Sequence, residues 1–335
     1  MGNSIHAKLA PSSADKWLGA GCTGYMKLVS IVNRDDSQAI KGTKLHEQAE
    51  AYLNNKNFQI DDEIKAYCDY IFFLQRELKV NKHVEEKLTI TEQCYGTADI
   101  IFESDDHLIV VDLKTGMLRV EPDSLQLKIY ALGAYLKYYN ESKNFTSVKT
   151  VIYQFGRADV YEYTFLELEA LKDQIISISE KVDNECFTFS ASSKGCRYCE
   201  HLIVCKAGQS FVKNQGLKLK QITDIPDGVI NIDDQIDIAK SVNNLSKQLL
   251  SDAKNLLIDN HITSNKYYLK ERQGRQVWTD EKLVIEYLKE MATADEYNTI
   301  VKETIPTPTQ LKKKGIDIPH LTKRIKSSFL LEENL

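Results

Sequence analysis

Two acidic residues near the middle of the chain lie inside hydrophobic segments, where carboxylates are unusual. Asp99 stands in one apolar run (residues 98–102), and Asp112 stands in a second (residues 108–113), two positions before Lys114. A buried carboxylate is costly unless it is paired or bound to a cation. Alternate residues of a strand point to one face, so Asp112 and Lys114 should lie side by side. Two acids and a lysine on paired strands are typical of a divalent-metal site that hydrolyses phosphodiesters.

The surrounding sequence predicts the elements that hold this site. A polar turn at residues 103–107 separates the two apolar runs, which is the pattern of a β-hairpin with buried strands. His46 lies in a predicted helix, and neutral imidazole suits a third metal contact beside two carboxylates. Gln126 and Tyr130 are four residues apart and therefore share a helix face. Both can hydrogen-bond a phosphate or a nucleobase, although singly they also fit a surface glutamine and a core tyrosine.

The order of predicted elements indicates an α/β domain over residues 1–212. Helices are followed by three strands, a helix, two strands and a further helix, which predicts a mixed central sheet flanked by helices. A change in composition predicts a linker over residues 213–227. Residues 228–335 are expected to form a mostly helical C-terminal domain of open role, with a small hairpin around residues 267–278.

Composition is that of an ordinary globular protein, with 335 residues, 42% hydrophobic, 27% charged and a net charge of −5. We find no apolar run near the ~20 residues of a membrane helix and no signal-peptide core, so we expect a cytoplasmic protein without a membrane partner. The slight acidity does not exclude nucleic acid, because local patches matter more than the total. A basic cluster near the C-terminus fits either a solvated surface or a phosphate-contacting patch. Its members are Lys312, Lys313, Lys314, Lys323, Arg324 and Lys326.

The seven cysteines divide into two groups. Three are scattered in apolar contexts and are expected to pack in the core, and these are Cys68, Cys94 and Cys186. The other four are one cysteine near the N-terminus and a C-x-x-C-x5-C motif, and these are Cys22, Cys196, Cys199 and Cys205. Four thiolates suit a [4Fe–4S] cluster and would equally satisfy a structural Zn²⁺, so the spacing alone leaves both open.

The candidate site residues form an ordered series of motifs, G-x-x-x-H, G-x-x-D, D-x-K and Q-x-x-x-Y. They fall at Gly42/His46, Gly96/Asp99, Asp112/Lys114 and Gln126/Tyr130. This series resembles the RecB-like branch of the P-D-(D/E)-x-K nuclease superfamily, over roughly residues 10–210. The resemblance implies a restriction-endonuclease-like fold.

The resemblance also implies roles for individual residues. Mg²⁺ or Mn²⁺ would be bound by His46, both acids and the carbonyl of Leu113, and Lys114 would orient the attacking water or stabilise the phosphorane. Gln126 and Tyr130 would position the strand or the lysine. Glu85 or Glu86, on the preceding strand, is expected to add an outer-sphere contact.

The cysteine pattern is similar to that of the iron–sulfur subset of these enzymes, which includes AddB-type recombination nucleases and CRISPR-associated exonucleases. The resemblance therefore favours [4Fe–4S] over Zn²⁺. It implies a metal-dependent DNA exonuclease that acts in recombination or repair and is carried by a phage. A single-strand annealing recombinase is the expected partner, and a homo-oligomer is a further expectation. The alternatives are an inactive nuclease-fold subunit for DNA binding or assembly, and a structure- or site-specific endonuclease. Intact Asp99, Asp112 and Lys114 favour an active enzyme.

Overall fold

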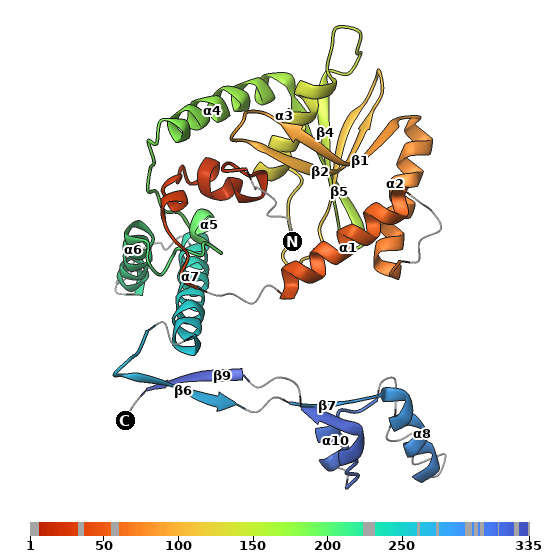
Figure 1. Cartoon of the computed structure of the whole chain (residues 1–335), viewed down its shortest axis with the longest axis vertical. Coiled ribbons are helices and arrows are strands. Elements are labelled where there is room, and N and C mark those ends of the chain that lie inside the picture. Colours follow the sequence, from red (N-terminus) through yellow and green to blue (C-terminus); the bar gives the residue numbers. More distant parts are fainter. Residues whose placement is uncertain are drawn as a thin grey trace. The chain divides into compact units, whose positions relative to one another are not determined.

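The structure is a computed structural model of the chain (Figure 1). It describes residues 7–32, 37–54, 60–223, 232–259, 262–272, 275–291, 297, 301, 305–313, 315–324 and 328–333. The chain divides into two compact units, Met1–Ala253 and Lys254–Leu335.

A five-stranded mixed sheet is the centre of the first unit. Its strands are β1 (Asn81–Thr89), β2 (Tyr95–Glu103), β3 (Leu108–Leu113), β4 (Ser147–Gln154) and β5 (Arg157–Thr164), and they are paired in that order. Strands β3 and β4 are parallel, while the other three pairs are antiparallel. All six residues of β3 are buried, as expected for a central strand that is covered on both faces. The predicted mixed α/β class is confirmed.

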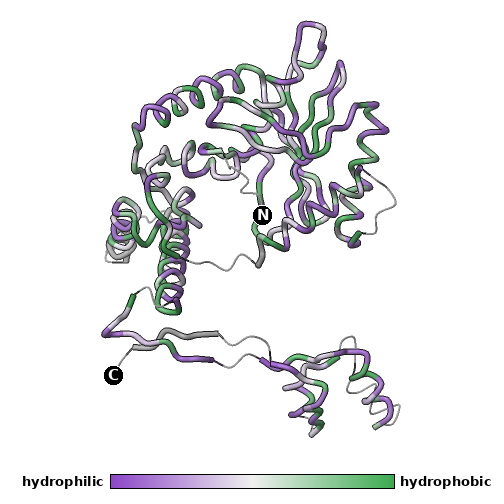
Figure 2. The backbone as a smooth tube through the Cα atoms, in the orientation of Figure 1, coloured by the Kyte–Doolittle hydropathy of each residue, from purple (hydrophilic) through white to green (hydrophobic). Residues whose placement is uncertain are grey.

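Helices cover both faces of this sheet (Figure 1). One layer contains α1 (Ser37–Asn54) and α2 (Asp62–Leu78), and the other contains α3 (Leu125–Tyr138) and α4 (Phe165–Asp183). Helix α3 is the crossover that joins the parallel strands β3 and β4. Each layer buries its own apolar cluster against the sheet. The hydrophobic and hydrophilic residues that alternate along α2 and α4 follow from this one-sided burial (Figure 2).

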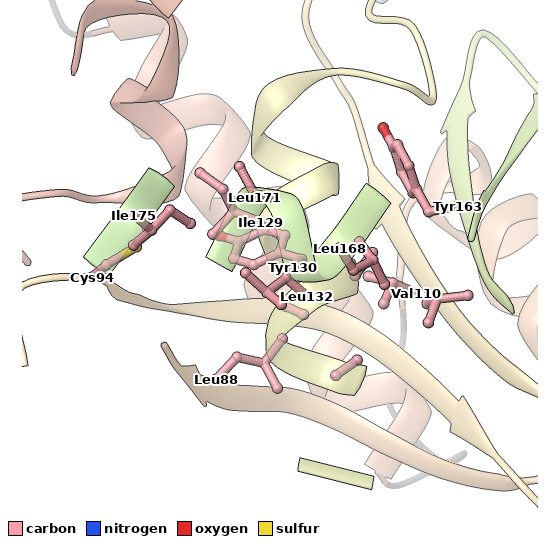
Figure 3. Close-up of a cluster of buried hydrophobic side chains, with 14 of the residues drawn as sticks. Leu88, Cys94, Val110, Ile129, Tyr130, Leu132, Tyr163, Leu168, Leu171 and Ile175 are labelled. Atoms are coloured by element: carbon pink, nitrogen blue, oxygen red, sulfur yellow. The ribbon is translucent and has the colours of Figure 1, made fainter. Parts of the chain in front are cut away.

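The cluster under α3 and α4 shows how these helices are fixed. Leu168, Leu171 and Ile175 recur three and four residues apart on α4 and belong to one buried cluster with Ile129 of α3 (Figure 3). At its N-terminus α4 has a capping box, in which the side chain of Thr164 accepts from the third backbone N–H of the helix. Helix α3, which carries Gln126 and Tyr130, is thereby held on the sheet.

The first unit contains further helices outside the two layers. These are η1 (Pro11–Ser13), η2 (Asp15–Gly19), η3 (Gly24–Lys27), α5 (Ser193–Cys196), α6 (Lys206–Thr223) and α7 (Ile232–Ile258). The linker predicted at 213–227 is wrong up to Thr223, because α6 continues through it, and residues 224–227 lie outside the described ranges. Lys213 and Asn214 are exposed on this helix, while Phe211 and Val212 of the same helix pack beside Cys196.

The second unit contains α8 (Glu281–Met291), α10 (Pro308–Lys313), η4 (Pro319–Leu321) and four strands. The strands are β6 (Tyr267–Arg272), β7 (Gln276–Trp278), β8 (Thr322–Arg324) and β9 (Ser328–Glu333). The predicted hairpin is wrong: β6 pairs with β9 and β7 with β8, in two separate antiparallel ribbons. The residues between β6 and β7 are of types that favour a turn, which led to the hairpin prediction. In the structure, both strands pair instead with strands near the C-terminus. Within the described ranges, we find no helix with the length and apolar character needed to cross a bilayer.

Candidate active site

His46 of helix α1 is in contact with Asp99 of the inner strand β2. Nδ1 of His46 lies 3.2 Å from Oδ1 of Asp99, and Oδ2 of Asp99 accepts from the backbone N–H of Leu113 at 2.7 Å. Helix α1 is held by Leu45 and Ala49, which are buried in the cluster it shares with α2, and this packing presents His46 to the strand. Both oxygens of Asp99 are therefore oriented by fixed partners from a helix and a neighbouring strand.

A second group of predicted residues forms a chain of polar contacts toward α3. Lys114 Nζ lies 2.8 Å from Oδ2 of Asp112 and donates to Oε1 of Gln126 at 3.0 Å. Nε2 of Gln126 in turn lies 3.5 Å from the hydroxyl of Tyr130. The side chain of Asp112 is only 4% exposed, so its carboxylate lies in a largely dry environment beside one ammonium group. The four residues predicted from sequence are brought together.

Two glycines of the motif series allow close approach. A Cβ on Gly42 would lie 3.3 Å from Oγ1 of Thr115, in the loop that follows Lys114. A Cβ on Gly96 would lie 3.1 Å from the ring of Tyr130 and 3.0 Å from Pro11. The glycines therefore let α1 and α3 approach the strands that carry the acids.

The three ligand atoms that converge are not those predicted. Ligand atoms of His46, Glu85 and Asp99 all lie within 4.8 Å of one another, and the described residues contain no other such group of three His, Cys, Asp or Glu side chains. Asp112 stands outside this group, with its carboxylate beside Lys114. Of the predicted ligands His46, Asp99 and Asp112, the first two belong to this group, and Glu85 completes it.

A small hollow lies over this group. It is lined by residues of α1, α2, β1, β2 and β3, including His46, Glu50, Tyr67, Glu85, Asp99 and Leu113. Leu113, whose carbonyl was the predicted backbone ligand, therefore lies at the same hollow. Glu50 and Tyr67 were not predicted, although Glu50 follows His46 by one helical turn and its spacing could have indicated it.

Two acids of the site, Asp112 and Glu85, have raised pKa values. Burial raises the pKa of Asp112 to about 6, although Lys114 works in the opposite direction. Burial together with the charges of Asp99 and Glu50 raises the pKa of Glu85 to about 7. Burial lowers the pKa of His46, but its hydrogen bond to Asp99 and the nearby carboxylates outweigh this and raise it overall. The site therefore carries an excess of negative charge, which a divalent cation would offset.

The four cysteines of the second predicted site lie around one hollow. Cys22, Cys196, Cys199 and Cys205 line a space of about 340 Å³ between the N-terminal segment and the region of α5 and α6. Burial raises the pKa of the Cys196 and Cys199 thiols, and the neighbouring thiols of the four add to it. Lys16, Tyr25 and His201 also line this hollow, and the sequence analysis did not single them out. A backbone N–H, that of Gly208, donates to Sγ of Cys205 at 3.4 Å.

The remaining cysteines and the basic cluster have mixed outcomes. Cys68 and Cys94 are buried as predicted, but Cys186 is exposed in the turn after α4, so its predicted core position is wrong. In the basic cluster, Lys312 pairs with Asp317 at 2.7 Å. Other members are exposed and divided between α10 and β8, and these are Lys313, Lys323 and Arg324. Lys314 and Lys326 lie outside the described residues.

Comparison with known proteins identifies a family. Residues 6–325 match the model of the family DUF2800, which is described as "Protein of unknown function". The chain belongs to the DUF2800 family. Among solved structures, this DUF2800 protein is similar to the crystal structure of SSO0001, with 14% identity and a TM-score of 0.28, over 49% of this chain and 82% of that one. A similarity of this size carries no argument about fold or activity.

Proposed function

We propose that this DUF2800 protein is a metal-dependent deoxyribonuclease that hydrolyses phosphodiester bonds at DNA ends. The observation that carries the proposal is the juxtaposition of a lysine and a histidine with two carboxylates from the inner strands β2 and β3. Lys114 lies beside Asp112, while Asp99 contacts His46 and the backbone of Leu113. The choice of DNA ends rests on the resemblance of the motif series to RecB-like nucleases.

The donor set fits a hard divalent cation. Carboxylate oxygens with one imidazole and a backbone carbonyl suit Mg²⁺ or Mn²⁺. His46, Asp99, Asp112 and the carbonyl of Leu113 would hold the ion. Such an ion, when bound, polarises a phosphoryl oxygen and makes its bound water more acidic.

The residues of the chain would supply orientation and charge. Lys114 has three N–H donors, of which one goes to Gln126 and one faces Asp112. The third is left for the attacking water or for a phosphoryl oxygen whose charge increases during the reaction. Gln126 is itself held by Tyr130, so α3 fixes the direction of the lysine. Replacing Lys114 with methionine should abolish cleavage while the protein stays folded and still binds Mn²⁺, and retained cleavage would refute the assignment.

We also propose that the four cysteines hold a [4Fe–4S] cluster. The support is their separation, because no three of these thiols lie within 4.8 Å of one another among the residues described. Four thiolates on a single Zn²⁺ would lie about 3.8 Å apart, given tetrahedral Zn–S bonds of about 2.3 Å. A four-iron cluster separates its ligands further, with one thiolate at each iron. Protein purified without oxygen should contain four iron and four sulfide per chain, and stoichiometric zinc without iron would contradict this.

A further inference from the structure

The pairing of β1 with β2 is interrupted at one place, beside the candidate metal site. The register is regular from one end of β1 to the other, which puts Glu85 directly opposite Asp99, yet this pair is missing from the ladder. Glu85 has a φ of 51°, in the left-handed region that residues other than glycine seldom adopt. Strained backbone of this kind persists where the surrounding structure enforces it, and it concentrates at functional sites.

Both strands change the face that they present at this pair. Val84 and Ile100 pack with the cluster under α1 and α2, whereas Leu88 and Ala98 pack with the cluster under α3 and α4. Residues two or four apart on a regular strand share a face, so the strands must switch sides between these positions. The switch keeps Glu85 out of both apolar clusters and places it at the hollow with His46.

Two carboxylates directly opposite each other on neighbouring strands destabilise a sheet. Here the ligand atoms of Glu85 and Asp99 lie within 4.8 Å, with His46 completing the group. A cation between them would convert this repulsion into attraction.

An independent observation points to a ligand at the same place. Tyr67 is 1% exposed and lines the same hollow, and its hydroxyl has no hydrogen-bond partner among the described residues. The charges of Asp99, Asp112 and Glu85 all act on this hydroxyl, which places it near the three acids. A buried hydroxyl without a partner is costly, and a water or oxygen bound to a metal would satisfy it.

We infer that Glu85 is a direct ligand of the divalent cation and that its own left-handed backbone conformation directs its side chain there. We infer also that the Tyr67 hydroxyl donates to an oxygen bound to that cation. The inference rests on the metal site of the proposed function and adds two residues to it. It also replaces the outer-sphere role expected for Glu85 or Glu86. Glu86 is engaged elsewhere, in an ion pair with Lys137 of α3.

The test is Mn²⁺ binding by the full-length chain without DNA, measured by calorimetry and by the electron paramagnetic resonance of free Mn²⁺. Glu85→Gln should weaken binding at least about tenfold, since even outer-shell partners of metal ligands change affinity by about 10–100-fold. Glu86→Gln, which removes the same charge one residue away, should bind as the wild type does. Glu85→Gly serves as a second variant because glycine adopts the observed φ without strain, so its loss of affinity cannot be assigned to misfolding. Tyr67→Phe should weaken binding less than Glu85→Gln.

The outcomes separate this inference from the nuclease proposal. Wild-type affinity in both Glu85 variants, with affinity lost in Asp99→Asn, would overturn the role of Glu85 and leave the nuclease proposal standing. Binding that depends on Glu85 in a protein that cleaves no DNA would support this inference and refute the nuclease proposal. An equal loss in Glu86→Gln would also overturn the inference, because general charge would then explain the effect.

Discussion

Asp112→Asn should stabilise the metal-free protein, although it removes one partner of an ion pair. Burial is the largest influence on this carboxyl group and raises its pKa from 3.8 to about 6. A pKa raised by about two units means that ionisation of Asp112 lowers the free energy of unfolding by about 3 kcal/mol. Lys114 is 21% exposed, so water can solvate its ammonium after the substitution, and Gln126 still accepts from it. The variant should therefore gain about 2–3 kcal/mol at pH 8 with a chelator present.

The gain should depend on pH in a defined direction. The native state holds the Asp112 proton more tightly than the unfolded state, so wild-type stability falls as the pH rises from 3.8 to about 6. The advantage of the variant is absent below this window and complete above it. It should therefore be about 1 kcal/mol larger at pH 8 than at pH 5.

The assay is urea unfolding followed by tryptophan fluorescence. The chain has two tryptophans. Trp17 is buried in the first unit, and Trp278 lies in the second unit. A Trp278→Phe background makes the signal report the first unit alone. Adding Mn²⁺ should stabilise the parent protein more than the Asp112→Asn variant. A variant that is less stable than its parent at pH 8 in chelator would refute the reasoning, because the ion pair would then outweigh the burial penalty.

Three further predictions concern other parts of the first unit. Cys199→Ser should prevent assembly of a four-iron cluster, visible as loss of bound iron and of visible absorption, and an unchanged iron content would contradict the assignment. Gln154→Ala should lower unfolding free energy by about 2–3 kcal/mol in urea titrations, because this buried amide bonds Val120, Gly116 and Leu118 in the loop after Lys114. Thr164→Ala should cost about 1 kcal/mol by removing the cap of α4 while cleavage is unchanged, so a loss of cleavage would show that this helix does more than support the core.

The sequence predicted which of the candidate residues lie side by side where local geometry decides the outcome. Asp112 and Lys114 share a strand face, and Gln126 and Tyr130 share a helix face, because those spacings follow from the periods of the two structures. That these pairs meet, and that His46 reaches Asp99, is a tertiary fact that periodicity alone cannot supply. The ordered motif series supplied it, since it resembles a family in which these residues converge.

The failures have physical causes as well. Glu85 lies at the hollow because its own backbone is left-handed and because the strands change face there. Neither feature has a signal in the local sequence. The linker prediction took a polar helix face for a loop, because exposure and irregularity favour the same residue types. The hairpin prediction assumed that neighbouring strands pair, whereas β6 pairs with β9, about sixty residues away.

The most direct test of the account is degradation of end-labelled linear DNA by protein purified without oxygen, in Mg²⁺ or Mn²⁺. We expect loss of label by the wild type, none with chelator or with Asp112→Asn, and no cutting of closed circular DNA. Comparing 5′ and 3′ labels would give the direction of degradation. Failure of a folded protein that binds Mn²⁺ and carries its cluster to degrade any linear DNA would contradict the account. Cleavage by the Asp112→Asn variant at the wild-type rate would contradict it equally.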